Sequence, residues 1–315
     1  GPVCPADSVP LVATGAVDYA WSNGATGSSV LTRPPVTTTY SVDGTNTAGC
    51  MDGAEVTVTV DGTGCAADVQ VRVLLEGPMD VGIGLMNDAL RAAGLVPLVE
   101  PYTALGYAWP AGSGGSSTAA LVLSVTGNDA VVDWVLVELR DPAQPEVVLA
   151  ARSALLQRDG DIVDVDGTSA LRFAVGEGGY QVAVLHRNHL GVMTASPATL
   201  GWTSAGVDLT SAGVPTFGTN ARKTVGTAPA FLVLWAGDVT FNSQVKYTGG
   251  GNDRDPILQA IGGTVPTATV TGQYRREDVN MNGQVKYTGS ANDRDIILQN
   301  TGGTVPPATR NAQVP

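Results

Sequence analysis

Residues 238–269 read DVTFNSQVKYTGGGNDRDPILQAIGGTVPTAT, and residues 278–309 read DVNMNGQVKYTGSANDRDIILQNTGGTVPPAT. The two stretches align without a gap at a spacing of 40 residues, and 23 of the 32 positions are identical. Agreement at this level is far beyond chance and marks a duplicated structural unit. The rest of the chain is interpreted outward from this repeat.

The start of each copy carries oxygen-bearing side chains at alternate positions. The second copy has Asp278, Asn280 and Asn282 at positions 1, 3 and 5, followed by Gly283 and Gln284. Calcium takes roughly six to eight oxygen ligands, and loops of this pattern supply them from positions 1, 3 and 5 and from the carbonyl at position 7. Glycine at position 6 permits the sharp turn. The pattern therefore predicts a calcium site in this loop.

The first copy repeats these positions with two changes. It has Asp238, Thr240, Asn242 and Gln244, with Ser243 where the second copy has glycine. We therefore expect a calcium site here as well, and we expect it to be the weaker of the two.

The acid that closes each loop is left open by the sequence. An EF-hand loop has a carboxylate at position 12, but this position holds Gly249 and Gly289. The next carboxylates come in pairs, Asp253 and Asp255 in the first copy and Asp293 and Asp295 in the second. Each pair precedes an aliphatic stretch that we expect to be a short helix, with Asn252 or Asn292 as its N-cap.

Turn formation is the alternative for the repeat, because Asp and Asn side chains also stabilise turns by bonding to their own main chain. If calcium binds, its role is to fold a segment with little hydrophobic core. The free energy of binding then becomes free energy of folding.

Residues 1–62 predict a small sandwich of short strands. Tyr19 and Trp21 lie on one face of a strand that ends in a polar turn, and the run 55–60 alternates with Val56 and Val58 facing inward. Short strands between Gly, Asn and Asp turns at this spacing are typical of an immunoglobulin-like module.

The three cysteines of the chain, Cys4, Cys50 and Cys65, form no zinc-ligand pattern. We expect one disulfide and one free thiol, which suits an extracellular protein. The sequence leaves open whether Cys50 pairs with Cys4 or with Cys65.

Residues 68–236 predict a larger β-sandwich, and residues 237–315 contain the duplicated module. Strands are expected at 69–75, 119–125, 131–139, 146–151, 169–175, 180–185 and 231–235. One short helix is expected at 86–93. Many strands with little helix give a chain that is mainly β.

Two smaller clusters within residues 68–236 have simple interpretations. His186 and His189 are the two histidines of the chain, and no HExxH motif or third ligand accompanies them, so structural hydrogen bonding is favoured over metal binding or catalysis. The acidic run at 159–166 is favoured as a solvated hairpin with turns at Gly160 and Gly167 over a third calcium site.

The composition argues against several classes of function. The chain has 17 Lys and Arg against 29 Asp and Glu, a net charge of −12, so it lacks the basic face that nucleic acid or anionic lipid requires. No apolar stretch approaches the ~20 residues that span a bilayer. GxSxG, P-loop and dinucleotide-binding motifs are absent, so we expect no enzyme.

Several stretches resemble known families. The patterns YAWSNG (19–24), TTYSV (38–42) and TVTV (57–60), with Cys4 and Gly-Cys at 49–50, resemble the Ig-like repeats of large secreted bacterial proteins, which implies a spacer. The duplicated unit resembles dockerin repeats, in which two calcium loops are each followed by a helix. It departs from them by an inserted T-G-x-x-N-D-R before the closing acid.

Residues 66–315 as a whole are similar to the C-terminal region of large secreted surface proteins of the Bacteroidetes type. The similarity is carried by VDWVLVELR (132–140), DGDIVDVDGTS (159–169), HRNHLGVMT (186–194) and the two NDRD sequences. It implies an extracellular, cell-surface location and the use of calcium.

These features predict an extracellular structural or adhesive surface protein with calcium as a stabiliser. One form is a filament or other homopolymer, in which neighbouring subunits hold ends such as residues 310–315, through strand addition at a sheet edge. The alternative is an adhesin domain that binds carbohydrate or protein. The aromatic side chains that would mark it are Tyr247, Tyr287, Trp109 and Trp202.

Overall fold

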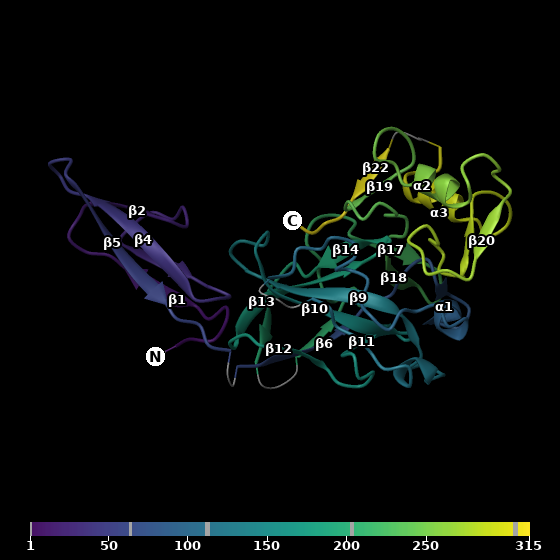
Figure 1. Cartoon of the computed structure of the whole chain (residues 1–315), viewed down its shortest axis with the longest axis horizontal. Helices are drawn as coiled ribbons and strands as arrows, with labels where there is room; N and C mark the ends of the chain where they lie inside the picture. Colours follow the sequence, from purple (N-terminus) through teal and green to yellow (C-terminus); the bar gives the residue numbers. More distant parts are fainter. Residues whose placement is uncertain (1, 63–64, 111–113, 202–204, 305–307) are drawn as a thin grey trace.

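The computed structural model describes residues 2–62, 65–110, 114–201, 205–304 and 308–315. The chain is mainly β, with 38% strand and 8% helix. An elongated N-terminal module lies at one end of the molecule, a curled sheet lies in the centre, and the C-terminal repeats lie beside it (Figure 1). Among the described residues, no helix has the length and apolar character needed to cross a membrane.

The N-terminal module contains two small antiparallel sheets, in the orders β1-β3 and β2-β4-β5. The strands are β1 (Val9–Val12), β2 (Asp18–Trp21), β3 (Ser29–Thr32), β4 (Thr38–Thr45) and β5 (Met51–Val58). A small core lies between the sheets, formed by Leu11, Trp21, Val30, Tyr40, Val42 and Val58.

Two details of this module differ from what the sequence suggests. Val56 lies on the inner face, as predicted, since it is in register with the buried Tyr40, but it is not covered: it is 43% exposed, against 8% for Val58. The disulfide joins Cys4 to Cys65, so Cys50 pairs with neither and is the free, exposed thiol.

The central part is a nine-stranded sheet in the order β12-β6-β11-β10-β9-β13-β14, with β16 added parallel to β6 and β15 added to β13. Its strands are β6 (Ala67–Arg72), β9 (Val131–Arg140), β10 (Val148–Gln157), β11 (Asp161–Val163), β12 (Leu171–Phe173), β13 (Gly178–His186), β14 (His189–Met193), β15 (Ala198–Leu200) and β16 (Ala205–Asp208). Every residue of β9 is buried, which identifies it as the centre of the core.

Smaller elements surround this sheet. They are β7 (Met79–Asp80), β8 (Leu85–Met86), α1 (Ala89–Ala92), the 3-10 turn η2 (Val122–Ser124), β17 (Arg222–Val225) and β18 (Phe231–Leu234). Six of the seven predicted strand segments contain a strand. The prediction for 119–125 is wrong, because local bonds such as Val122 N–H to the carbonyl of Ala119 close η2 and leave Leu121 80% exposed.

The C-terminal repeats form two short strand pairs and two helices. The elements are β19 (Gln244–Lys246), α2 (Arg254–Ala260), β20 (Thr269–Thr271), β21 (Gln284–Lys286), α3 (Asp293–Asn300) and β22 (Thr309–Asn311). The strand that follows each helix pairs with the other copy: β22 pairs with β19, and β20 pairs with β21. The copies therefore fold together, around a separate cluster that includes Val245, Val285, Ile257 and Ile297.

Candidate metal centres

Two buried carboxylates organise the loop of the second copy. Asp278 accepts hydrogen bonds from the main-chain N–H groups of Asn282 (3.0 Å) and Gly283 (2.8 Å). Asp293, at the start of α3, accepts from the N–H groups of Val279 (2.7 Å) and Lys286 (2.8 Å). Both carboxylates are fully buried, so the loop wraps around two acids that come from its opposite ends.

The first copy repeats this arrangement. Asp238 accepts from the N–H groups of Asn242 and Ser243, both at 2.9 Å. Asp253 accepts from the N–H and the hydroxyl of Thr240, each at 3.0 Å, and from the N–H of Lys246 at 2.8 Å. Asp238 is 2% exposed and Asp253 is fully buried.

The second acid of each pair points away from its loop. Asp255 accepts from the Asn252 side-chain amide at 2.9 Å and pairs with Arg254 at 2.8 Å, and its side chain is 45% exposed. Asp295 makes the same two contacts with Asn292 and Arg294, both at 2.8 Å. The geometry therefore brings Asp253 and Asp293 to the loops and leaves Asp255 and Asp295 outside them.

The helix caps explain this choice. Asn252 Oδ1 accepts from the N–H of Asp255 at 2.9 Å, and Asn292 Oδ1 accepts from the N–H of Asp295 at 3.0 Å. Asn292 is the N-cap of α3, as the sequence predicts. In α2 the cap position belongs to Asp253, and Asn252, one residue earlier, makes the bond that Asn292 makes in the second copy. This bond places the residue three positions later in the first turn of the helix, where its side chain faces solvent.

The inward carboxylates have unusual electrostatics. Burial raises the pKa of Asp238 to about 7 and that of Asp293 to about 7, and in each case the partner acid raises it further. Burial also raises the pKa of Asp253 and of Asp278 to about 6. None of the four forms an ion pair with a Lys, Arg or His side chain of the described residues. Each loop therefore concentrates negative charge that a bound cation would neutralise.

Side-chain amide oxygens also accept hydrogen bonds within the loops. Asn280 Oδ1 and Asn282 Oδ1 accept loop N–H groups at 3.1 Å and 2.9 Å, and Asn242 Oδ1 does the same at 3.0 Å in the first copy. The side chains of Gln244 and Gln284 are exposed. Within the described ranges no group of three or more His, Cys, Asp or Glu side chains is placed to hold a metal ion, so a cation in either loop would have two carboxylates together with amide, hydroxyl and main-chain oxygens as its donors. This set suits calcium and not zinc.

Asn188 holds the first residues of both loops at the tip of the β13–β14 hairpin. Its carbonyl accepts the N–H groups of Gly237 (2.9 Å) and Asp238 (3.1 Å). Its side-chain amide donates to the carbonyls of Arg276 (3.0 Å) and Asp278 (2.9 Å). One buried residue of the central sheet thus positions the opening acid of each copy.

Beneath Asn188 lies a buried ionic network that the sequence analysis did not identify. Asp133, inside β9, accepts from Arg187 Nε at 2.8 Å and from the Tyr274 hydroxyl. Burial alone would raise the pKa of Asp133, but Arg187 and His186 hold it at about 2. A lone Asp within the apolar run VVDWVLV was the available signal, because a charge buried in a strand requires a partner.

Both histidines belong to this network. His186 lies 3.2 Å from Asp133, and His189 accepts from the N–H of Gly77 at 3.1 Å. Burial lowers the pKa of both imidazoles. The hydrogen-bonding role that the sequence predicts is the one that the geometry supports.

The acidic run at 159–166 makes turn and ion-pair contacts. Asp164 pairs with Arg152 at 2.6 Å and Asp161 with Arg72 at 2.7 Å. Asp166 accepts from the N–H groups of Thr168 and Ser169, both at 2.9 Å. Each of these three acids has its own partner, either an arginine or the main chain of its turn, as expected for a hairpin with turns.

The aromatic side chains named as adhesin markers are partly covered. Tyr247 and Tyr287 pack against the C-terminal cluster, with the guanidinium groups of Arg254 and Arg294 over their rings at 5.2 and 5.0 Å. Trp109 packs edge-on against Tyr107 at 4.9 Å. Trp202 lies outside the described residues.

Comparisons of the chain with protein-family models, with curated proteins and with solved structures found no match.

Proposed function

We propose that residues 237–315 bind two calcium ions, one in each loop, and that the protein is an extracellular structural or adhesive surface protein stabilised by these ions. The observation that carries the proposal is the pair of buried acids in each loop, Asp238 with Asp253 and Asp278 with Asp293. Charge buried in this way destabilises a fold unless it is neutralised. The same oxygens form a donor set that calcium prefers.

The proposal gives each part of the chain a role. The N-terminal module acts as an Ig-like spacer, and the central sheet, closed as a β-sandwich, acts as the platform that holds Asn188. The repeat pair acts as a dockerin-like module, since two loops each followed by a helix pack on one another. Calcium is a structural ion in this scheme, and the chain carries out no catalysis.

Calorimetric titration with calcium, together with thermal melts in calcium and in EDTA, tests the proposal. We expect two bound ions per chain and a melting transition that is lost in EDTA and restored by calcium. Absence of binding with identical melts would show that the repeat contains turns alone.

A homopolymer is the assembled form we propose for the structural role. The end of the chain does not contribute to it as expected, because Ala312 donates its N–H to Ser243 (2.8 Å) and Arg140 donates to the Pro315 carbonyl (2.7 Å) of the same chain. A sheet edge therefore has to supply the contact. Light scattering after size exclusion, at high concentration with calcium, tests it, and a monomer alone would count against a polymer.

Glycan binding is the second candidate. A cavity of about 690 Å³ lies between the second loop and the β7–β8 turn, and its lining includes the amide side chains of Asn87, Asn280, Asn282, Asn292 and Gln299. Amide groups in a concave site suit hydroxyl-rich ligands. Binding on a glycan array that requires calcium and is lost in Gln299→Ala would support this role over a purely structural one.

A further inference from the structure

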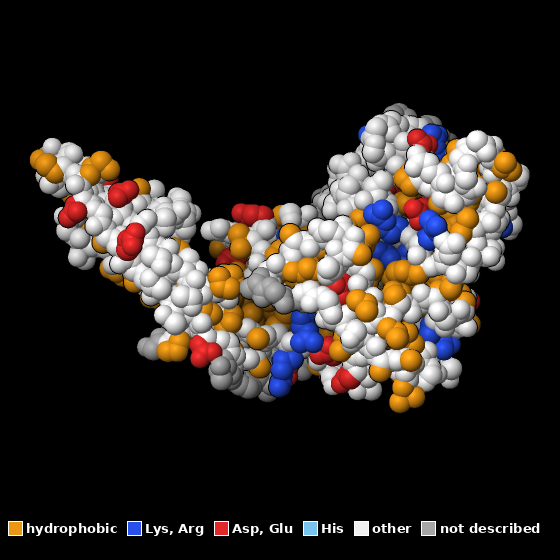
Figure 2. Space-filling model, in the orientation of Figure 1, with side chains coloured by type: hydrophobic (Ala, Val, Ile, Leu, Met, Phe, Trp, Pro, Cys, Tyr) orange, Lys and Arg blue, Asp and Glu red, His pale blue; other side chains and the backbone are white. Residues whose placement is uncertain are grey.

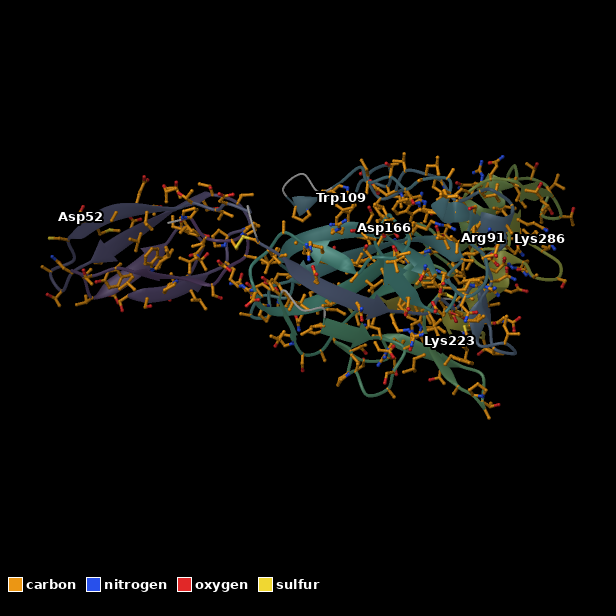
Figure 3. All side chains as sticks on the ribbon, turned by 90° about the horizontal axis from the view of Figure 1, so that it is seen from below. Asp52, Arg91, Trp109, Asp166, Lys223 and Lys286 are labelled. Carbon is orange, nitrogen blue, oxygen red and sulfur yellow. A yellow bond between two sulfur atoms is a disulfide. The ribbon has the colours of Figure 1, made fainter. Side chains whose placement is uncertain are left out.

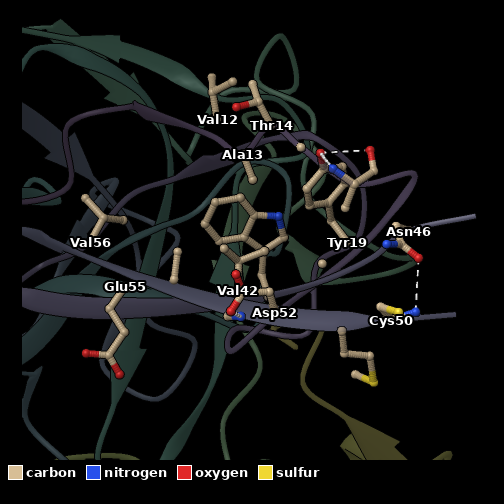
Figure 4. Close-up of a pocket in the computed structure, with 17 residues that line it drawn as sticks. Val12, Ala13, Thr14, Tyr19, Val42, Asn46, Cys50, Asp52, Glu55 and Val56 are labelled. Carbon is tan, nitrogen blue, oxygen red and sulfur yellow. Dashed lines mark hydrogen bonds between the residues drawn. The ribbon is translucent and has the colours of Figure 1, made fainter. Parts of the chain in front are cut away.

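The N-terminal module contains a groove of about 490 Å³ between its two sheets. The end of β1 and the residues after it form one wall, β5 forms the other, and Trp21 and Val42 lie between them. Figure 4 shows Val12, Ala13 and Thr14 on one side and Asp52, Glu55 and Val56 on the other. Val56 is 43% exposed and Val12 is 67% exposed, so the groove is open and presents apolar side chains beside polar ones.

The wall formed by β5 is also a free sheet edge. β5 pairs with β4 from Met51 to Val58, and its other edge has no strand partner among the described residues. Seven of its eight residues are exposed. An edge strand of this length presents a row of main-chain N–H and C=O groups to which another strand can bond.

The charge of the module is one-sided. Residues 2–62 contain six acidic residues, Asp7, Asp18, Asp43, Asp52, Glu55 and Asp61, and one basic residue, Arg33. Arg33 is already engaged, since it donates to the carbonyls of Ala6 (2.8 Å) and Gly179 (2.9 Å). The face of this module in Figure 2 shows acidic side chains and no Lys or Arg.

We propose that β5 and the groove bind an extended peptide segment of a partner protein, in which apolar side chains alternate with Lys or Arg. The segment adds a strand beside β5, its apolar side chains enter the groove over Trp21, and its cationic side chains, on the opposite face of the strand, meet Glu55. Main-chain bonds supply affinity in this mode and alternate side chains supply specificity. A second copy is disfavoured as the occupant, because its β5 would bring the same acidic residues to the edge.

This surface is remote from the calcium loops, so the inference goes beyond the proposed function and is tested separately. Figure 3 shows Asp52 at one end of the long axis and Lys286, beside the second loop, near the other. Cys50 lines the groove and is the free thiol. An environment-sensitive dye on Cys50 of the full chain therefore reports on occupancy of the groove.

The experiment titrates the dye-labelled protein with a short synthetic peptide that alternates Val and Lys. We expect saturable binding, hydrogen-exchange protection of residues 51–57, and at least about tenfold weaker binding of the same peptide with Glu in place of Lys. Equal binding of the two peptides, or protection elsewhere in the chain, would overturn the proposal. Dye changes on self-association without peptide would also overturn it, in favour of a second copy.

Two charge reversals separate local recognition from general attraction. Glu55→Lys lies on β5, on the face opposite the groove, and Asp18→Lys lies at the exposed start of β2, the opposite edge of the same sheet. Both change the net charge equally. We expect Glu55→Lys to weaken binding of the Val-Lys peptide several-fold more than Asp18→Lys does, and equal effects would overturn the assignment to β5.

Discussion

The first and second copies of the repeat adopt left-handed backbone at the same positions. Phe241 and Met281 both have φ of 56°, and Ser243 and Gly283 have φ of 65° and 81°. The inward acids, the outward acids and the asparagine bonds at the helix starts also correspond in the two copies. The loop and the start of the helix therefore have the same geometry in the two copies, even at positions where the residues differ, such as Phe241 and Met281.

The copies differ where they contact the central sheet. Asn300, at the end of α3, donates to Glu76 (2.6 Å) and to the carbonyl of Ala236 (2.8 Å), and it accepts from Lys223 (2.7 Å). The matching residue of the first copy is Ala260. The comparison teaches that the two copies share the structure of the loop, and that residues such as Asn300 and Ala260 differ because the copies have different neighbours.

Removing an inward acid should have the largest effect. We expect Asp253→Ala and Asp293→Ala each to reduce the calcium stoichiometry from two to one. Calcium is expected to stabilise the fold by about 2.7 kcal/mol per site at a hundredfold excess over Kd. Asp293→Ala should lose more of this stabilisation than Asp253→Ala, because we expect the second copy to bind calcium more tightly. Calorimetry and melts measure both. Asp295→Ala is the control, and loss of a site in this variant would show that the outward acid is the ligand.

Removing Asn300 tests the difference in neighbours. Asn300→Ala removes the side-chain bonds to Glu76, to Lys223 and to the carbonyl of Ala236, although Glu76 and Lys223 remain paired with each other. Loss of buried bonds of this kind costs about 1–3 kcal/mol. We expect this decrease in the free energy of unfolding, in calcium, by urea denaturation. Gln299→Ala, one residue earlier on the exposed side of α3, should change it little. Equal effects would refute the role of Asn300 as an anchor.

The pH dependence tests the feature that both copies share. Without calcium, the pKa values of the inward acids, about 6 and about 7, lie above their unfolded values. Their protonation therefore favours the folded state, and this stability is lost as pH rises through 6 to 7. His186 and His189, whose pKa values are lowered by burial, contribute the opposite trend, so the acids are isolated by comparison with a variant that lacks them. From pH 8 to pH 5 in EDTA we expect the free energy of unfolding of the wild type to rise by at least about 1 kcal/mol relative to the variant Asp238→Asn, Asp293→Asn.

Calcium should reverse this trend, because the ion requires the deprotonated acids. Asp255 and Asp295, whose pKa values are lowered by bonds that include those from Asn252 and Asn292, contribute nothing in this pH range. The double variant Asp238→Asn, Asp293→Asn lacks the contribution of two of these acids and keeps that of the histidines. A wild-type protein that gains no stability toward pH 5 relative to this variant, in EDTA, would contradict the assignment.

The periodicity and the repeat in the sequence predicted much of the architecture. They did not predict which of two nearby side chains faces a loop, or which residues far apart in the chain make contact. The helices at α2 and α3 and the N-cap of α3 were predictable, because cap residue and aliphatic run are adjacent in the chain. The choice between Asp253 and Asp255 was not, since both lie within the first turn and only the bonded cap distinguishes their directions. Asn188 was missed for the same reason, because its partners lie 49 to 90 residues away.

The difference at position 6 of the loops gives the smallest expected effect. Ser243 has a left-handed backbone that favours glycine, and the second copy carries the same kind of strain at Ala291, with φ of 52° where the first copy has Gly251. Each copy therefore has a glycine that would relieve the other. We expect Ser243→Gly and Ala291→Gly each to stabilise the protein by about 0.5–1 kcal/mol, less than a full left-handed penalty because glycine also gains entropy when unfolded.

Ser290→Gly is the matched control, because neither Ser290 nor its counterpart Gly250 has a positive φ. With no strain to relieve, added glycine there increases only the entropy of the unfolded chain, so a small loss of stability is expected. Urea denaturation in calcium compares the three variants. If Ser290→Gly stabilised the protein as much as Ser243→Gly, backbone strain would not be what distinguishes the loops, and the weaker binding expected of the first copy would then rest on Thr240 in place of Asn280 alone.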